Sequence, residues 1–265
     1  MYNVTYHRAS SVDDAVKLIG KADDGKFVSG GMTLIPAMKI RLAAPSDLVD
    51  LTHVATLKGI KVDGKNVRIG AGTVHADVAA NKELAKACPA LASLAGMIGD
   101  PAVRHRGTIG GSIANNDPAA DYPAALVALG ATVITNKREI AAEDFFTGLF
   151  ETALDDGEMV TAVTFTAPEK AGYEKFPNPA SRYAIVGVFV AKTAAGARAV
   201  VTGAGENGVF RSKEIEAALA KAFDASALDG VTIPSAGLMS DIHASADYRA
   251  SLIKVMAKRA VAKVA

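Results

Sequence analysis

The sequence of 265 residues contains a single cysteine, Cys88, and this scarcity excludes several kinds of site. One thiol cannot form an internal disulfide or supply the ligands of a cysteine-based cluster. If iron–sulfur chemistry is involved, another chain must carry it. No Gly-Lys-Ser/Thr of a Walker phosphate loop occurs, and His53 and His243 lack the spacing of paired metal-binding histidines.

Long apolar runs and an excess of charge of one sign are also missing. No apolar run approaches the ~18 residues that indicate a membrane span, and the first residues have no apolar core of signal-peptide length. The net charge is +1, and the lysines and arginines are scattered among acidic residues. The sequence therefore predicts neither a nucleic-acid-binding nor a membrane-binding surface, and we expect a cytoplasmic protein.

What the sequence does contain is a globular core, because 50% of its residues are hydrophobic. Ser10 or Ser11 is expected to cap a helix that ends at Gly20. Asp63-Gly64 indicates a hairpin turn, and a second antiparallel pair is expected to turn at Ala195-Gly196. Further strands are expected over residues 26–30, 47–51, 131–135 and 158–165, and further helical regions over residues 34–42, 75–98, 124–130, 211–223 and 247–265.

Strands and helices are mixed without a clean βαβ rhythm, which favours an α+β fold over a doubly wound sheet. Composition shifts towards proline and charge over residues 166–182. We therefore place a domain boundary near residue 170.

Two glycine pairs stand at the starts of predicted helices and have polar companions. The first lies in "SGGMT", residues 29–33, and the second in "TIGGS", residues 108–112, followed by Asn115. Glycine permits close backbone approach, and amides at a helix start can face an anion without a lysine. Each pair alone is typical of an ordinary turn; together they suggest a diphosphate held from both sides.

A third glycine segment imitates a dinucleotide-binding fingerprint. "GAGENG", residues 203–208, is a literal G-x-G-x-x-G after a strand-like run, and Asp224 lies at about the distance of a ribose-binding acid. However, no second βαβ unit follows, and the remaining chain is too short for a nucleotide-binding fold. We interpret the segment as a loop at the end of a sheet.

Two long stretches carry a resemblance to a known family. "SGGMTLIPAMKIRLAAPSDLVDL" and "GDPAVRHRGTIGGSIANNDPAADYPAALVALGA" closely resemble the FAD-binding medium subunits of molybdenum hydroxylases. This family includes carbon monoxide, xanthine and aldehyde dehydrogenases and related azaheterocycle oxidisers. The resemblance covers essentially the whole chain, and the pattern T-I-G-G-S-x-A-N-x-D-P-x-x-D is long and specific.

The resemblance implies a two-lobed FAD-binding domain of the vanillyl-alcohol-oxidase (PCMH) type. Its lobes would comprise residues 1–55 and 56–170. A small α/β domain with an antiparallel sheet and helices would follow over residues 171–265. The diphosphate and ribityl chain would lie between the lobes.

The resemblance also implies which residues hold FAD. Asp121 matches an acid that contacts the polar chain or sugar, Ile98 an apolar residue close to the cofactor, and Val160 and Lys175 match further contacts in looser register. Met32 departs from the small or polar residue common at its position, which leaves a backbone role intact. The remaining matched positions are Ser29, Gly30, Gly31, Thr33, Leu34, Thr108, Ile109, Gly110, Gly111, Ser112 and Asn115.

Four residues near these motifs have more than one interpretation. His75 opens a predicted helix and either caps it or approaches the cofactor. His105 is expected to lie in a solvated loop, with a flavin contact as the alternative. Arg104 and Arg106 either brace this loop with Asp100 or face phosphate or a partner chain.

No nucleophile triad or pair of catalytic carboxylates appears, as is typical of a subunit whose cofactor supplies the chemistry. By resemblance, electrons would reach FAD from [2Fe-2S] clusters of a small partner subunit after hydroxylation at the molybdenum cofactor of a large one. The complex would be a dimer of heterotrimers, with carbon monoxide, an aldehyde or an N-heterocycle as substrate. NAD, a quinone or oxygen would accept the electrons. A self-sufficient flavin oxidase of the same fold and a module without cofactor are the alternatives.

Overall fold

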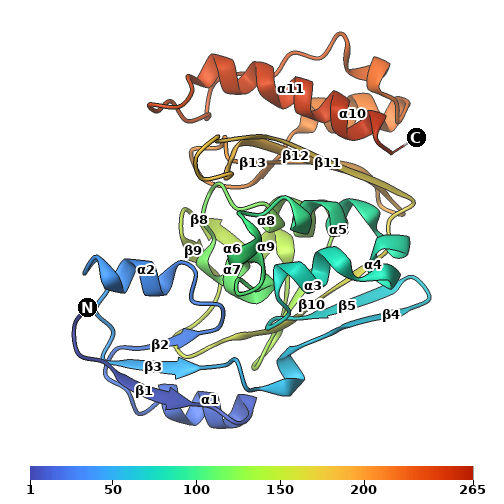
Figure 1. Cartoon of the computed structure of the whole chain (residues 1–265). Helices are drawn as coiled ribbons and strands as arrows, with labels where there is room; N and C mark the ends of the chain where they lie inside the picture. The colour runs from blue at the N-terminus through green and yellow to red at the C-terminus, as the bar shows by residue number, and fades with distance from the viewer. Residues whose placement is uncertain (265) are drawn as a thin grey trace.

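Three β-sheets and a two-stranded ribbon organise residues 1–264, the part of the chain that the computed structural model describes (Figure 1). Helices separate two of the sheets, and a further pair of helices covers the C-terminal sheet from outside. Because the two larger sheets are antiparallel and the smallest is parallel, the α+β class predicted from the sequence is confirmed.

The N-terminal lobe is the parallel part of the molecule, and it alternates strand and helix. The order is β1 (Thr5–Arg8), α1 (Val12–Ile19), β2 (Gly25–Val28), α2 (Leu34–Lys39) and β3 (Asp47–Asp50), with β3 in the middle of the sheet. The expectation of no βαβ rhythm is therefore wrong for this lobe. Strands of four residues are too short for their hydrophobic periodicity to show this alternation in the sequence. Ser11 caps α1, as predicted, by accepting from the amide of Asp14.

A five-stranded sheet forms the centre of the molecule. Its order is β4 (Ile60–Asp63), β5 (Asn66–Gly70), β10 (Val160–Thr166), β6 (Thr132–Thr135) and β7 (Glu139–Ala141). β10 follows β5 by almost 90 residues in the sequence, yet it pairs with β5 on one side and with β6 on the other. In the predicted first hairpin Asp63 pairs with Asn66, so the loop residues are Gly64 and Lys65, one position later than expected. Gly64 has the positive φ, +57°, that this turn requires.

The helical region predicted over residues 75–98 is divided into three helices, α3 (His75–Ala80), α4 (Lys82–Ala87) and α5 (Pro89–Gly96). Asn81 breaks the first helix and caps the second by accepting from the amide of Leu84, and Pro89 opens the third. The chain continues through α6 (Pro101–Arg104), α7 (Ile109–Asn115), α8 (Tyr122–Leu129) and α9 (Ala142–Phe145), with a 3₁₀ turn, η1 (Ala55–Leu57), before β4 and the ribbon β8 (Phe146–Gly148) and β9 (Glu151–Thr152) after α9.

The C-terminal sheet has the order β11 (Lys170–Pro177), β12 (Ala184–Thr193), β13 (Gly196–Thr202) and β14 (Phe210–Arg211). Thr193 pairs with Gly196, so this hairpin turns at Ala194-Ala195. α10 (Lys213–Lys221) and α11 (Ala246–Ala262) cover one face, with a 3₁₀ turn, η2 (Ala225–Leu228), between them. The other face packs against α5 and α8. About half of the segment predicted to separate domains, residues 166–182, is strand β11, and its last residues belong to the loop that leads to β12.

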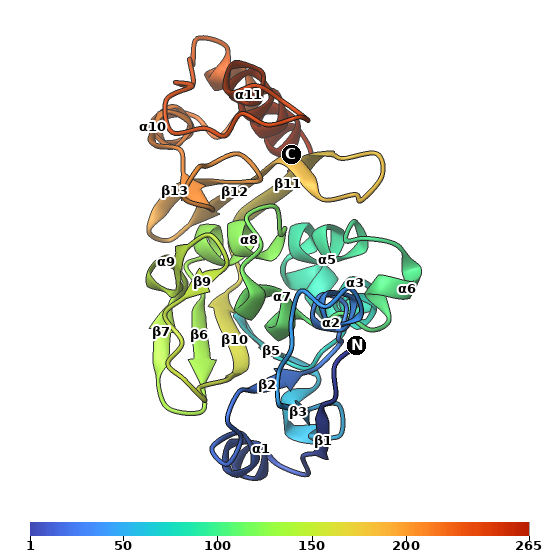
Figure 2. The same ribbon diagram turned by 90° about the vertical axis from the view of Figure 1, so that its left-hand side faces the viewer.

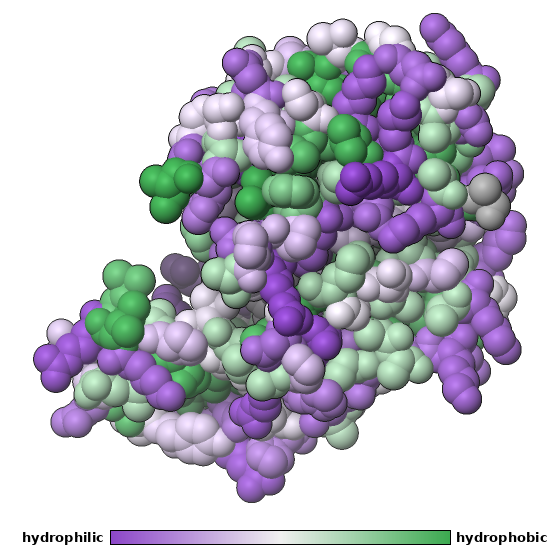
Figure 3. Space-filling view, turned by 45° about the horizontal axis from the view of Figure 1, so that its top comes forward, coloured by the Kyte–Doolittle hydropathy of each residue, from purple (hydrophilic) through white to green (hydrophobic). Residues whose placement is uncertain are grey.

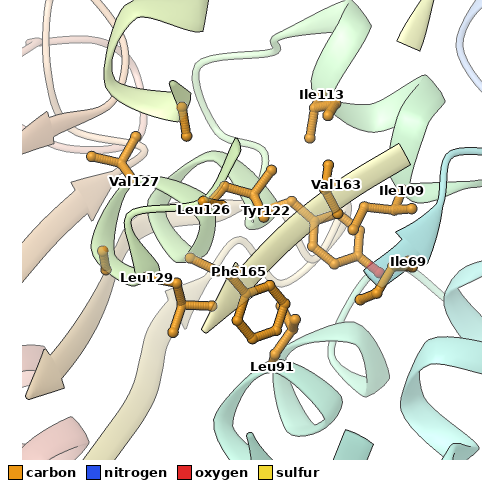
Figure 4. Packing of buried hydrophobic residues seen from close by; sticks show 14 of the residues in the cluster. Ile69, Leu91, Ile109, Ile113, Tyr122, Leu126, Val127, Leu129, Val163 and Phe165 are labelled. Carbon is orange, nitrogen blue, oxygen red and sulfur yellow. The ribbon is translucent and has the colours of Figure 1, made fainter. Parts of the chain in front are cut away.

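The main hydrophobic core lies between the central sheet and the C-terminal sheet (Figure 4). All eight residues of α8 are buried, because this helix is enclosed by both sheets. Its composition follows from that position, since a helix that is apolar all round must be covered all round. α8 thereby fixes the segment that precedes it, residues 117–121, against the rest of the molecule.

Within residues 1–264, no helix is long and apolar enough to cross a membrane. The same residues contain no group of three or more histidine, cysteine, aspartate or glutamate side chains placed to hold a metal ion.

Candidate functional site

A cavity of about 590 Å³ lies where the N-terminal lobe, the helices beside the central sheet and a loop of the C-terminal sheet meet. In the space-filling view the smaller lobe projects from the main body, and a recess separates the two (Figure 3). Turned by 90° from Figure 1, the ribbon shows α2 in front of α3, with α7 beside them (Figure 2). The lining contains the following predicted site residues: Ser29, Gly30, Gly31, Met32, Thr33, Leu34, Ile98, Thr108, Gly110, Gly111, Ser112, Asn115, Asp121 and Val160.

The first glycine turn provides free backbone donors. It connects β2 to α2, and Gly31 has a φ of +71°, which glycine adopts without strain. Among the described residues, none accepts a hydrogen bond from the amides of residues 29–33. A run of unpaired amides at the start of a helix favours a bound anion. This turn therefore has the donor set that the sequence predicted.

The two glycine turns are in direct contact. A Cβ added at Gly30 would strike the carbonyl oxygen of Arg106 and lie 2.7 Å from the Cα of Gly107. The Thr108 hydroxyl donates to the Ser29 hydroxyl at 3.2 Å. Gly30 is thus required for the approach of two segments about 80 residues apart in the sequence. Residues from both sides of the junction line the cavity.

The second glycine turn differs from the prediction, because its amides are already paired within the protein. Ile109 N donates to Thr73 O at 3.1 Å, Gly110 N to Ala71 O at 2.8 Å, and Gly111 N to the Thr108 hydroxyl at 3.1 Å. The turn is tied to the end of β5 and capped by its own threonine, so it cannot form a second amide cradle. Its residues Thr108, Gly110, Gly111 and Ser112 still line the cavity, and a Cβ added at Gly111 would meet only the Thr108 hydroxyl oxygen.

Ile109 and Lys175, which the resemblance assigned to the site, do not line the cavity. The Ile109 side chain is fully buried in the main core, because the first residue of α7 faces the central sheet. Lys175 lies behind the cavity wall, where its ammonium donates to Asp121 Oδ2 at 3.0 Å.

Asp121 lines the cavity and forms a buried cluster with Lys175 and Tyr173, neither of which lines it. Its carboxylate also accepts from the Tyr173 hydroxyl, so both of its oxygens are engaged by β11. Burial raises the pKa of Asp121, and the neighbouring Lys175 ammonium opposes this rise. The cluster joins the start of α8 to the C-terminal sheet and fixes Asp121 in the cavity lining.

His75 lies in the cavity wall and does not cap a helix. The N-cap of α3 is Val74, whereas the His75 side chain is only 4% exposed and packs beside Tyr122. Its Nδ1 lies 3.2 Å from the Tyr122 hydroxyl oxygen. Burial, followed by the nearby Arg104 charge, lowers the pKa of His75 to about 4, so the ring is neutral at pH 7. Of the two interpretations of His75, the capping role is wrong.

Arg104 braces the loop beside the second glycine turn, but through carbonyl groups and not through Asp100. Its Nη1 donates to Ile98 O at 2.9 Å and to Gly99 O at 3.0 Å. Asp100 instead caps α6 by accepting from the amide of Val103. His105 is exposed, with its Nδ1 2.7 Å from Pro101 O, and does not line the cavity. The bracing holds Ile98 in the cavity wall.

The loop between β11 and β12 lines the cavity, although no residue of it was predicted to do so. Ser181, Arg182 and Tyr183 line the cavity from the C-terminal sheet, and Arg182 Nη1 reaches Gly99 O at 3.2 Å. Asn178 organises this loop by accepting from two of its amides. The one indication in the sequence was the proline-rich "PNPASRY", whose composition favoured a boundary between domains. Only the fold shows that this hairpin loop turns back over the cavity.

Apolar side chains line another part of the cavity, and these were also missed. Leu51, Leu57, Leu154 and Met159 contribute from four separate segments, none of which has a motif. The "GAGENG" segment, by contrast, does not line the cavity and forms the connection between β13 and β14, as the sequence interpretation expected.

Glu158 lies in the cavity wall two residues before β10, and its carboxylate makes the stability of the fold depend on pH. Hydrogen bonds from Arg138 are the main reason that the pKa of Glu158 falls to about 2, against the opposing effect of burial. Since folding lowers this pKa, the carboxylate stabilises the fold above about pH 4.5, and the contribution is lost as the pH falls towards 2. We expect Glu158→Gln to be less stable at pH 7 and to approach the wild type between pH 4 and 2 in urea unfolding. A stability difference that stays constant over this range would contradict the assignment.

Comparison with known proteins identifies a cofactor-binding family, in agreement with a cavity bordered by two glycine turns. Residues 2–168 match the family described as "FAD binding domain in molybdopterin dehydrogenase". The chain is 35% identical to the carbon monoxide dehydrogenase medium chain of Afipia carboxidovorans over 97% of this chain and 94% of that one. It is 31% identical to the nicotine 6-hydroxylase medium subunit of Paenarthrobacter nicotinovorans over 97% and 96%.

Solved structures give the same result. A chain of carbon monoxide dehydrogenase from Hydrogenophaga pseudoflava superimposes with a TM-score of 0.88 at 33% identity, covering 100% of this chain and 99% of that one. A chain of quinoline 2-oxidoreductase from Pseudomonas putida 86 superimposes with a TM-score of 0.87 at 28% identity, covering 99% and 97%. This chain therefore belongs to the family of FAD-binding domains of molybdopterin dehydrogenases.

Proposed function

We propose that this chain is the FAD-carrying, electron-transferring medium subunit of a molybdenum hydroxylase. The observation that carries the proposal is the run of unpaired amides at residues 29–33 that borders a cavity of about 590 Å³. A diphosphate needs such donors, and the cavity has the volume typical of a small-molecule site. Membership of the FAD-binding family supplies the identity of the nucleotide.

The residues present fit FAD in three respects. The first glycine turn offers amide donors to the diphosphate, and the Ser112 hydroxyl, which has no partner among the described side chains, adds a donor from the second lobe. Apolar side chains at Leu51, Leu57 and Met159 suit a flat aromatic ring. Tyr183 and Ile98 also line the cavity, where they offer apolar surface to a second ring.

When bound, FAD supplies the ability to exchange electrons singly or in pairs, which couples one-electron donors to a two-electron acceptor. The chain's own contribution is to bind and orient the cofactor and to exclude water from part of it. The segment 117–121, fixed by α8, and the loop 178–183 enclose the cavity from the side of the C-terminal sheet. Rigid walls of this kind favour a single orientation of a bound ring.

We further propose the subunit composition of the complex and its location in the cell. The relatives are named as medium chains or subunits, which supports a complex with a large molybdenum-cofactor subunit and a small subunit with [2Fe-2S] clusters. We propose a dimer of such heterotrimers in the cytoplasm. Within this chain the FAD-binding lobes would be residues 1–55 and 56–170, and residues 171–265 the C-terminal domain. Carbon monoxide, an aldehyde and an N-heterocycle are the candidate substrates of the whole complex.

The test is reconstitution of the isolated chain with FAD. The purified chain, freed of flavin and shown to be folded by circular dichroism, would be titrated with FAD while flavin fluorescence and visible absorbance are followed. We expect saturable binding of one FAD per chain. A folded chain that binds no FAD would overturn the proposal. Metal analysis of partners that copurify with a tagged chain tests the assembly.

A further inference from the structure

Among the described residues that line the cavity, His75 is the one histidine, and the proposed site has not used its ring nitrogens. The imidazole is 4% exposed and lines the cavity, and its Nδ1 is engaged by Tyr122. No described residue is a hydrogen-bond partner of Nε2. Arg249 Nε is the only fully buried side-chain nitrogen or oxygen without a partner among the described residues, so Nε2 of His75 is not fully buried, and its ring lines the cavity.

The tautomer of His75 follows from its neighbour. The Tyr122 side chain is fully buried, and Nδ1 of His75 is the only described hydrogen-bond partner of its hydroxyl. A buried hydroxyl that failed to donate would cost free energy, so the Tyr122 hydroxyl donates to Nδ1. The proton of the neutral imidazole then lies on Nε2. Nε2–H is therefore a donor that faces the cavity.

The position of the ring is fixed from a second side by Gly107. A Cβ added at Gly107 would lie 2.6 Å from Nε2 of His75, so only glycine leaves room for the imidazole there. Gly107 also touches Gly30 of the first turn, and its carbonyl accepts from the His75 amide at 2.9 Å. One glycine thus separates Nε2 from the place where the two glycine turns meet.

We infer that His75 is a binding residue for the nucleotide, and that its Nε2–H donates a hydrogen bond to an oxygen of the phosphate–ribityl chain. The inference rests on the proposed function, because it assigns a further donor within the same FAD site. The Nε2–H donor is neutral, so it orients the phosphate–ribityl chain of the nucleotide. The amides of residues 29–33, at the start of a helix, attract the negative charge of the diphosphate.

Nitrogen-15 NMR of the imidazoles tests the inference directly. In the apoprotein at pH 7, His75 should show a protonated Nε2 and a bare Nδ1. Addition of FAD should shift Nε2 and leave the exposed His105 unchanged. A His75 Nε2 resonance that does not move at saturating FAD, or a proton on Nδ1, would overturn the inference.

Variants separate a binding role from a structural one. His75→Phe should lower FAD affinity about 10-fold, the usual effect of losing one hydrogen bond. Because it also orphans the Tyr122 hydroxyl, the double variant His75→Phe/Tyr122→Phe should recover thermal stability while FAD affinity stays low. His105→Phe is the matched control and should bind FAD normally. Recovery of affinity in the double variant would show a merely structural role. Failure of the wild type itself to bind FAD would instead overturn the proposed function.

Discussion

Gly111→Val should give a folded, colourless protein whose affinity for FAD is reduced 100-fold or more. Gly111 is exposed to the cavity, and an added Cβ would meet only the Thr108 hydroxyl oxygen, at 3.0 Å. The valine methyl groups would therefore enter the cavity and not the core. Valine in place of glycine within a helix does not lower helix propensity, so the apoprotein should melt close to the wild-type temperature. Loss of about 3 kcal/mol of binding free energy corresponds to the 100-fold change.

Two other glycines provide the comparison for Gly111→Val. Gly230 also has open space around its added Cβ but lies outside the cavity, so Gly230→Val should bind FAD normally. Gly110→Ala should instead unfold the protein, because its Cβ would lie 2.5 Å from the Ala71 Cβ and 2.7 Å from the Ala71 oxygen. Fluorescence titration gives the affinity, and circular dichroism gives the melting temperature. Tight FAD binding by folded Gly111→Val would exclude this face as the binding surface.

The contrast between Gly110 and Gly111 shows what the sequence could predict about the site. A glycine pair beside hydroxyl residues indicates close approach of the backbone to something, and both pairs do line one cavity, although the second lies in the first turn of α7 and not before a helix. The pattern cannot say whether the neighbour is a ligand or another part of the chain. The space in which a Cβ of Gly110 would lie is filled by Ala71. The corresponding space at Gly30 is filled by the segment before Thr108, and both are contacts between residues distant in sequence.

The fold was predictable where local chemistry decides it. Ser11 and Gly20 mark the ends of α1, and the helix predicted over residues 124–130 is α8, which begins two residues earlier and ends one residue earlier. The parallel arrangement of β1, β2 and β3 was not predictable, because strands of four residues depend on the core they join and not on their own periodicity. The loop 178–183 was missed for the same reason, since its position over the cavity is set by the C-terminal sheet.

Lys175→Met should destabilise the fold by about 3–5 kcal/mol at pH 7, the usual effect of removing one partner of a buried ion pair. The Lys175 and Asp121 side chains are 4% and 5% exposed, so no water replaces the missing ammonium group. Asp121→Asn/Lys175→Met, which removes both charges, should recover much of the loss. Lys192→Met is the matched control on the neighbouring strand; its pair with Glu169 is largely exposed, so little stability should be lost.

The effect of Lys175→Met should depend on pH in a direction that the environment of Asp121 determines. Burial already raises the pKa of Asp121, and Lys175 is the main group that opposes the rise. Without the ammonium group, folded Asp121 holds its proton more tightly than the unfolded chain does, so stability falls as the pH rises above about 4. The difference from the wild type should therefore be largest at neutral pH and should narrow towards pH 4 in urea unfolding. A difference that widens on acidification would mean that Asp121 does not depend on Lys175 for its charge.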